Sequence, residues 1–254
     1  MYKRQEDVKA VVIRVNSPGG SALASDVIWT STQWLKDKKP VVTSFGNVAA
    51  SGGYYMSAGS NYIFAEPTTI TGSIGVFGLS FATQKFWNDR VGVTFDTEKS
   101  HRFSDLESLV RTLDPEEFRK MQSLVDNIYG DFLNVVVQGR STLETTEQVH
   151  EIAQGRVWSG KEAKNIGLVD AMGGIDDAVV KAAEFAKITD YTVEVFPKAK
   201  SPVEEFLMQF GDVSMKLVKS VVPASLVKIF KTTDEKSQLS ESIYTRIPFD
   251  ITVH

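Results

Sequence analysis

The sequence has 254 residues, of which 42% are hydrophobic and 24% charged, as is ordinary for a globular protein with a full core. A net charge of −4 provides no basic field, so we expect no nucleic-acid partner. No run of about 18 apolar residues occurs, which argues against a membrane-spanning helix in this sequence. The lack of cysteine excludes disulfides and thiolate metal sites, and we expect no metal or cofactor.

The first predicted element is a strand, because residues 11–15 form a β-branched apolar run. It stops at residues 16–21, which read NSPGGS. Pro18 fixes its own φ and lacks a donor, while Gly19 and Gly20 allow backbone conformations and close approaches that a Cβ would forbid. The loop is therefore suited to presenting backbone amides. An ordinary Pro-Gly turn into a helix has the same composition and stays open as the alternative.

A helix and a second strand follow. The helical pattern over residues 22–38 ends in lysines just before Pro40, which is a normal helix stop. The apolar residues 41–42 predict a strand that is buried on both faces, as in a parallel sheet. Phe45 and Gly46 predict that this strand leads into a turn of small residues.

Ser51 lies where that strand gives way to another helical segment, within the sequence AASGG at residues 49–53. At such a junction, exposed backbone N–H groups and the positive end of the helix dipole favour negative charge. Ser51 is therefore a candidate nucleophile or oxyanion neighbour. The alternative is an ordinary N-cap serine.

A short strand is predicted at residues 61–65, and the sequence TGSIGVFG follows at residues 71–78. Its small residues allow two backbones to approach closely or to form the wall of a groove. Thr71, Gly72 and Ser73 are therefore candidates for contacts with the backbone of a bound substrate. As surface residues they need no function at all.

The remaining chain predicts mainly helices, several of them begun by capping residues. We expect helices at residues 81–90, 114–135, from 145, 159–167 and 175–188, strands at 93–95, 168–170 and 191–196, and a polar loop at 96–108. After Pro197 the pattern changes to an amphipathic stretch at 203–230 and a polar tail at 232–242. We therefore divide the chain into a domain of residues 1–196 and a helical C-terminal extension with a mobile tail at 197–254.

Four motifs taken together resemble a known family: NSPGGS at 16–21, AASGG at 49–53, TGSIGVFG at 71–78 and GRVWSGKEAKNIGLVD at 155–170. Over about residues 8–190 the chain resembles the signal peptide peptidase A (SppA, protease IV) family of the ClpP/crotonase superfamily, in particular the C-terminal half of the long, two-repeat form. The resemblance implies an α/β fold of repeated β-β-α units with stacked, mostly parallel sheets. It also implies a homo-oligomeric serine endopeptidase that degrades residual signal peptides or other apolar extended peptides.

This resemblance also implies where the whole protein works. Only a short polar stretch precedes the first strand, so we expect earlier strands, a first repeat and a membrane anchor to belong before Met1. The full-length protein would then lie at the periplasmic face of a bacterial inner membrane, while this chain by itself would be soluble.

The expected site combines one serine with two amides. Ser51 would attack the scissile carbonyl, and the backbone N–H groups of Gly20 and Gly52 would hold the oxyanion. The residues expected to bind the substrate are Gly19, Thr71, Gly72 and Ser73.

A serine nucleophile also needs a base. The histidines of this chain lie in no pattern that an adjacent acid would orient, and a Ser-His-Asp triad would have to use His101. The resembling family uses a Ser–Lys dyad, and in its single-repeat form the lysine lies in a K-S-G-x-x-K-D pattern. Here residues 99–105 read KSHRFSD, which places Ser104 where the dyad lysine would stand. We therefore expect the lysine to come from a first repeat outside this chain.

Two other functions stay open. Because no base is evident in the chain, it could be a non-catalytic half or an oligomer scaffold of such a peptidase. A crotonase-type acyl-CoA enzyme would use the same pair of amides for a thioester oxyanion, but the serine of AASGG has no role in that chemistry.

Overall fold

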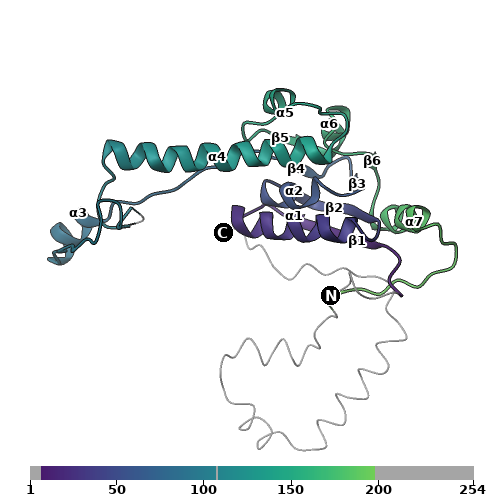
Figure 1. Ribbon diagram of the computed structural model, residues 1–254, viewed down its shortest axis with the longest axis horizontal. Helices are drawn as coiled ribbons and strands as arrows, with labels where there is room; N and C mark the ends of the chain where they lie inside the picture. Colours follow the sequence, from purple (N-terminus) through teal and green to yellow (C-terminus); the bar gives the residue numbers. More distant parts are fainter. Residues whose placement is uncertain (1–6, 107, 198–254) are drawn as a thin grey trace, which may run out of the picture. The chain divides into compact units, whose positions relative to one another are not determined.

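The computed structural model describes residues 7–106 and 108–197 (Figure 1). The chain divides into two units, residues 1–191 and 192–254, and the elements described below lie in the first. The predicted helical extension at 203–230 and the polar tail at 232–242 lie outside the described residues. The domain boundary at residue 196 therefore stays a prediction.

A mixed, six-stranded sheet forms the centre of the first unit. Its strands are β1 (Val11–Ser17), β2 (Val41–Ala50), β3 (Tyr62–Ala65), β4 (Ile70–Gly72), β5 (Val157–Ser159) and β6 (Ala171–Met172). Along the path β5-β4-β2-β3-β6, only β4 and β5 pair in antiparallel fashion, and β1 pairs with β2 in parallel. The predicted α/β class is confirmed.

Strand β2 is the axis of this sheet, since β1, β3 and β4 all pair with it. Its first six residues are buried, as the apolar run predicted. The turn expected at Phe45 and Gly46 is wrong, because the strand continues to Ala50. The absence of a side chain on Gly46 leaves room for Asn16, since a Cβ on Gly46 would lie 2.7 Å from the Oδ1 of Asn16. This Oδ1 accepts a hydrogen bond from the N–H of Val48 at 3.1 Å.

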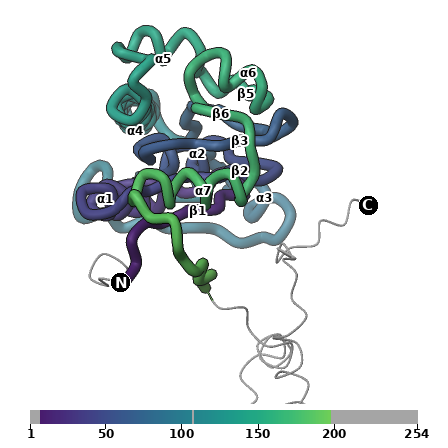
Figure 2. Tube along the Cα trace, turned by 90° about the vertical axis from the view of Figure 1, so that its right-hand side faces the viewer, coloured from purple at the N-terminus to yellow at the C-terminus, as the bar shows by residue number. Residues whose placement is uncertain are grey.

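Helices cover both faces of the sheet (Figures 1 and 2). They are α1 (Ala22–Lys36), α2 (Gly52–Ser57), the short α3 (Gln84–Phe86) with a π-helical turn (Trp87–Val91), α4 (Pro115–Gly139), α5 (Thr146–Ile152), α6 (Gly160–Asn165) and α7 (Ile175–Ala186). Helix α7 packs through Ala178 and Ala182 on Val42 and Phe64. On the other face, Tyr54 of α2 lies in the main core, with its ring 6.2 Å from that of Phe45.

The helix starts follow the capping signals of the sequence. Asp114 caps α4 and closes a capping box with Glu117. The same reciprocal arrangement begins α5 at Thr145 with Gln148 and α6 at Ser159 with Glu162. None of the helices in the described ranges combines the length and the apolar character needed to cross a bilayer.

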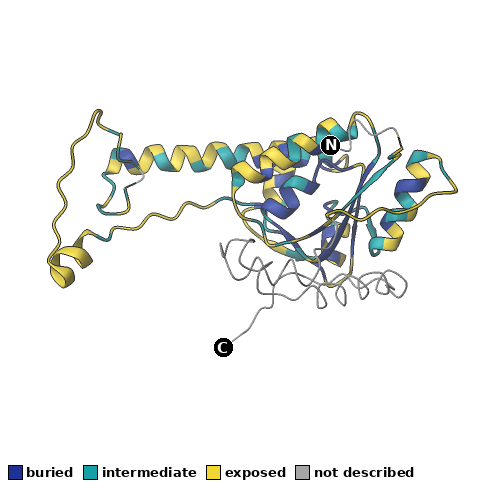
Figure 3. Ribbon diagram, turned by 90° about the horizontal axis from the view of Figure 1, so that it is seen from below, coloured by how far each residue is buried: buried dark blue, intermediate teal, exposed yellow. Residues whose placement is uncertain are grey.

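Several predicted strands and helices differ from the structure. The strands expected at 93–95 and 191–196 are wrong, because both segments are exposed and neither pairs with any of the six strands that the structure describes. The edge strand expected at 168–170 lies directly after these residues, as β6 at Ala171–Met172. The helix expected at 81–90 is reduced to α3 and its π-helical turn, on a segment that leaves the sheet and runs out along α4 (Figures 1 and 3). The apolar residues of that segment are exposed, so they do not pack on a core that would stabilise a longer helix or a strand.

Candidate active site

Ser51 occupies a strained turn between β2 and α2. Its φ of 51° and ψ of −119° belong to a region that residues with a Cβ rarely adopt. Neighbours hold it there: its N–H donates to the carbonyl of Gly72 at 2.9 Å, and its carbonyl accepts from the N–H of Tyr55 at 2.8 Å. The hydroxyl makes no capping hydrogen bond, so the N-cap alternative is not supported. This strand–turn–helix geometry lifts a side chain out of the sheet, as at the nucleophile of α/β hydrolases.

The diglycine loop lies directly against this turn. A Cβ placed on Gly19 would lie 2.8 Å from the nitrogen of Gly52 and 2.8 Å from the Cβ of Ser51. A Cβ placed on Gly52 would lie 3.3 Å from the nitrogen of Gly20. Glycine at these places therefore lets two backbones meet without an intervening side chain. The two reversals of the chain come together, as the sequence predicted.

Two amides at this junction are available to a ligand. The N–H of Gly19 donates to the hydroxyl of Ser17 at 3.2 Å. By contrast, within the described part of the chain no hydrogen bond occupies the N–H of Gly20 or Gly52. Gly52 is also the first residue of α2, where the N–H groups have no intrahelical acceptor. An oxygen carrying negative charge could accept from both.

A depression of about 240 Å³ opens beside these amides. Gly20 and Gly52 line it together with side chains of α1 and α2, among them Ile28 and Met56. Small-molecule sites typically measure about 300–1,000 Å³. This depression is smaller and largely apolar in its side chains, so it suits one apolar group of a larger ligand.

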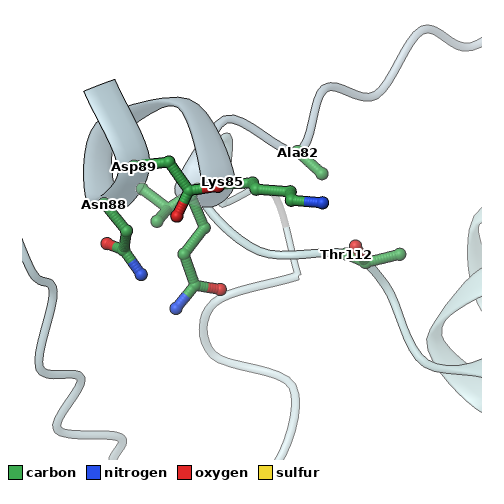
Figure 4. Close-up of a pocket in the computed structure, with 7 residues that line it drawn as sticks. Ala82, Lys85, Asn88, Asp89 and Thr112 are labelled. Atoms are coloured by element: carbon green, nitrogen blue, oxygen red, sulfur yellow. The ribbon is translucent and has the colours of Figure 1, made fainter. Parts of the chain in front are cut away.

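A second depression, of about 250 Å³, lies away from Ser51 on the segment that runs along α4 (Figure 4). Lys85, Asn88 and Asp89 project into it from the turn at α3, and Thr112 borders it from the returning loop. Its lining is mostly exposed, and none of its residues has the positive φ that Ser51 has. We therefore place the candidate site at Ser51.

The predicted substrate contacts divide into two kinds. Thr71 is fully buried, and its hydroxyl donates to the carbonyl of Ala49 at 2.6 Å, so the side chain joins β4 to β2 and does not face a ligand. Gly72 and Ser73 lie next to Ser51 through the backbone, since the carbonyl of Gly72 accepts from Ser51. Ser73 has a φ of 48°, and its N–H donates to the carbonyl of Arg156 at 2.7 Å.

Of the side chains that could in principle act as a base, Lys99 and His150 make their contacts away from Ser51. The ammonium of Lys99 lies 2.7 Å from a carboxylate oxygen of Asp105. The ring of His150 lies between the hydroxyl of Tyr129 at 2.9 Å and the amide of Gln154 at 3.0 Å. His101 is exposed on the same loop as Lys99. Among the residues that the structure describes, no histidine or lysine hydrogen-bonds to Ser51.

Behind α2 lies a buried polar network that the sequence analysis missed. The hydroxyl of Tyr54 donates to the carbonyl of Leu168 at 2.9 Å, and burial raises the pKa of this phenol. Arg140, only 5% exposed, donates to Asp170 at 2.5 Å. Asp170 also accepts from the N–H of Ile63 at 2.7 Å. The network fixes α2, and with it the turn at Ser51, to β3 and α4.

Comparison with known proteins agrees with this geometry. A family model described as peptidase family S49 matches residues 33–189. The chain is 40% identical over 230 residues to "Protease 4" of Salmonella typhi, covering 89% of this chain and 37% of that protein. It is 39% identical over 187 residues to "Serine protease SPPA, chloroplastic" of Arabidopsis thaliana, covering 73% of this chain and 27% of the relative. A third relative, "Putative protease slr0021" of Synechocystis sp., is 40% identical over 186 residues, covering 73% and 66%.

The chain therefore spans less than two thirds of the length of these relatives. The resemblance to the SppA family is confirmed, and three of the four motifs that carried it lie within the matched range. The chain belongs to peptidase family S49.

Proposed function

We propose that this chain carries the nucleophile of a serine endopeptidase of the Ser–Lys dyad type. The observation behind the proposal is the junction at Ser51. A strained serine projects beside two backbone N–H groups, from Gly20 and Gly52, that have no acceptor within the described residues. Strain of this kind costs of order 1–3 kcal/mol and persists at functional sites where the surrounding structure enforces it.

In the proposed reaction, the Ser51 hydroxyl oxygen attacks the scissile carbonyl carbon while a lysine takes the hydroxyl proton. The oxygen of the tetrahedral intermediate accepts hydrogen bonds from the amides of Gly20 and Gly52. The lysine then returns its proton to the leaving amine, and water hydrolyses the acyl-enzyme by the same steps. Each oxyanion donor is typically worth about 2.7–4 kcal/mol of the barrier.

The lysine is proposed to come from an N-terminal repeat that is not part of this chain. Its supply from elsewhere would account for Ser104 at the dyad position and for the ion pair that holds Lys99. A lysine becomes a base near neutral pH only when it is desolvated or placed near another cation. In the longer protein the two repeats would then form one site, with the fold of each made of the β-β-α units of the ClpP/crotonase superfamily.

The proposed substrates are residual signal peptides or other apolar, extended peptides. The depression beside Gly20 and Gly52 supports this class, because Ile28 and Met56 give it an apolar lining. One relative at 42% identity is named "Putative signal peptide peptidase SppA". The full-length protein would work as a homo-oligomer at the periplasmic face of a bacterial inner membrane, held by an N-terminal anchor.

The test replaces Ser51 by alanine in the longer protein and measures turnover of a chromogenic peptide ester. We expect turnover to be lost, and a fluorophosphonate to label Ser51 in the unaltered protein. Ser31→Ala is the matched control, because Ser31 is exposed on α1 and, among the described residues, its hydroxyl bonds only to the carbonyl of Val27. Unchanged turnover in Ser51→Ala would end the proposal.

A second candidate is a non-catalytic half that shapes the peptide groove. The observation in its favour is that no described base reaches Ser51. Failure of the fluorophosphonate to label Ser51 in the longer protein would favour this candidate. A crotonase-type acyl-CoA enzyme is a still weaker candidate. It would be indicated if the protein hydrolysed a CoA thioester and the Ser51→Ala variant kept this activity.

A further inference from the structure

The peptide group between Gly72 and Ser73 holds the strained serine in place. Its carbonyl oxygen accepts the N–H of Ser51 at 2.9 Å, and its own N–H donates to the carbonyl of Arg156 at 2.7 Å. One planar peptide group is therefore bonded to Ser51 on one side and to Arg156 on the other. A displacement of the Arg156 backbone would reach Ser51 through these two hydrogen bonds.

Residues 154–156, hereafter the 154–156 turn, lie tightly against the chain that follows β4. The N–H of Gly155 donates to the carbonyl of Ile74 at 2.9 Å. A Cβ placed on Gly75 would lie 2.9 Å from both the Cα and the nitrogen of Gly155, so the two backbones are in contact. Gln154 has a φ of 58°. This left-handed conformation is uncommon for a residue with a Cβ, and it persists only where neighbours enforce it.

His150 and Tyr129 are the neighbours that hold Gln154. The Nε2 of His150, in the last turn of α5, lies 3.0 Å from the Nε2 of Gln154, and its Nδ1 lies 2.9 Å from the hydroxyl of Tyr129 on α4. The same hydroxyl accepts the backbone N–H of Gln154 at 3.3 Å. Gln154 is thus fixed through its side chain and its backbone at once, by residues of two helices.

This hydrogen-bond pattern fits the neutral form of His150. The Oε1 of Gln154 accepts from Nη2 of Arg156 at 3.3 Å, so the side-chain nitrogen of Gln154, a donor, faces the imidazole ring. The ring nitrogen opposite it must accept, and the single ring proton lies on Nδ1, directed at Tyr129. A second ring proton would place two donors face to face. If the Gln154 amide rotated to accept from the imidazolium, Arg156 would lose its acceptor instead.

We propose that neutral His150 is a positioning residue for Ser51. By holding Gln154 it holds the 154–156 turn, and the carbonyl of Arg156 in that turn fixes the peptide group that accepts from Ser51. Histidine is the side chain that gains a proton between pH 8 and pH 5. We therefore expect this support of Ser51 to weaken as the pH falls through that range. The effect on the reactivity of Ser51 rests on the proposed function, whereas the effect on its backbone does not.

Charged side chains of both signs occur close to His150 on the elements that pack around it. The charged and titratable residues within one helical turn of the contact, and in the turn beyond it, are Asp126, Tyr129 and Asp131 on α4, Glu147 and Glu151 on α5, and Arg156. Carboxylates favour an imidazolium, and a guanidinium opposes it. The test therefore compares variants at the same pH and does not depend on the exact pH at which His150 gains its proton.

The first test follows backbone amides of the chain by NMR between pH 8 and pH 5. We expect the amide signals of Ser51 and Ser73 to shift along the same titration curve as the ring of His150. His150→Gln keeps an acceptor but gains no proton, so it should abolish both amide responses. Gln154→Gly removes the link while His150 still titrates, and the φ of 58° suits glycine, so both responses should be lost here too. His101→Gln is the matched control, because both histidines are exposed and His101 lies on another loop.

The second test measures the rate at which a fluorophosphonate labels Ser51 in the longer protein. Loss of one neutral hydrogen bond changes an equilibrium about two- to tenfold. We therefore expect the unaltered protein to be labelled about two- to tenfold more slowly than His150→Gln at pH 5, and at the same rate at pH 8. The general base titrates in both proteins, so its contribution cancels in this ratio.

The outcomes separate this proposal from the peptidase proposal. Amides of Ser51 and Ser73 that do not follow His150, or that keep their response in His150→Gln or Gln154→Gly, would overturn the positioning role. Equal labelling of the unaltered and His150→Gln proteins at both pH values would overturn it as well. If Ser51 is labelled in neither protein at any pH, the peptidase proposal fails, and the amide titration alone decides whether His150 positions the serine.

Discussion

The close approach of Gly19 to the turn at Ser51 predicts a specific cost for Gly19→Ala. The new methyl would lie 2.8 Å from both the nitrogen of Gly52 and the Cβ of Ser51, and 3.0 Å from the carbonyl oxygen of Ala50. These are backbone atoms and a short side chain, which cannot swing away. Gly19 also has a φ of 108°, which residues with a Cβ rarely adopt.

The magnitude follows from two separate effects. The backbone conformation costs an alanine about 1–3 kcal/mol. Overpacking against fixed atoms costs typically about 1–3 kcal/mol more. We therefore expect Gly19→Ala to lower the free energy of unfolding by about 2–6 kcal/mol. A shift of Ser51 away from the diglycine loop would relieve part of this strain. It would also separate Ser51 from the amide of Gly20, so labelling of Ser51 by a fluorophosphonate should be slower in this variant.

Gly20→Ala is the matched comparison. Gly20 has a φ of 153°, but a Cβ placed there meets no atom within 4 Å. Only the backbone effect applies, so this variant should lose about 1–3 kcal/mol less than Gly19→Ala. Urea unfolding of both variants at equal m-value measures the difference. Equal stability of the two variants would refute the contact between the diglycine loop and Ser51.

Three further predictions concern single side chains. Ser51→Gly should raise the free energy of unfolding by about 1 kcal/mol, because relief of about 1–3 kcal/mol of strain outweighs the roughly 0.5–1 kcal/mol entropic cost of glycine. The same change should abolish labelling by the fluorophosphonate. A lower melting temperature of this variant would contradict the prediction. Tyr54→Phe leaves the buried carbonyl of Leu168 without its donor and should cost about 1–3 kcal/mol in urea unfolding, with no loss if the hydrogen bond is unimportant. Hydrogen bonds from Arg111 lower the pKa of Glu117 from 4.5 to about 2. The depressed value means that this carboxylate stabilises the folded loop around Arg111 above about pH 4.5 and that the contribution is lost as the pH falls toward 2. Glu117→Gln should therefore flatten the acid limb of the unfolding profile, and an unchanged limb would speak against this contribution.

The two loops of the candidate site could be predicted from the sequence because local residue patterns specify them. The NSPGGS and AASGG motifs predicted two chain reversals rich in backbone amides, and the structure brings them into contact. The capping boxes at Asp114, Thr145 and Ser159 also depend only on residues three apart. Such features involve neighbours in the chain, so the sequence carries them in full.

Other features depend on residues that are distant in sequence. In the sequence, Thr71 is indistinguishable from a surface threonine. In the structure, β4 pairs with β2, and the Thr71 hydroxyl donates a hydrogen bond to the carbonyl of Ala49. Arg140 and Asp170 give no local signal, yet their ion pair supports α2. The segments at 93–95 and 191–196, whose patterns predicted strands, pair with none of the described strands and are irregular. A strand requires a neighbour for its hydrogen bonds, and sequence alone does not say whether one is present.

The sequence by itself determined the family, the α/β class, the helix starts and the pair of amide-rich loops, because each is written in short-range residue patterns. Only the tertiary structure decided that Ser51 is strained, that Thr71 faces inward and that the segment of residues 77–100 lies exposed (Figure 3). Those properties come from pairing and burial between segments that can be more than a hundred residues apart, such as Ile63 with Asp170. Burial and pairing are properties of the folded chain as a whole, and local patterns constrain them only in part.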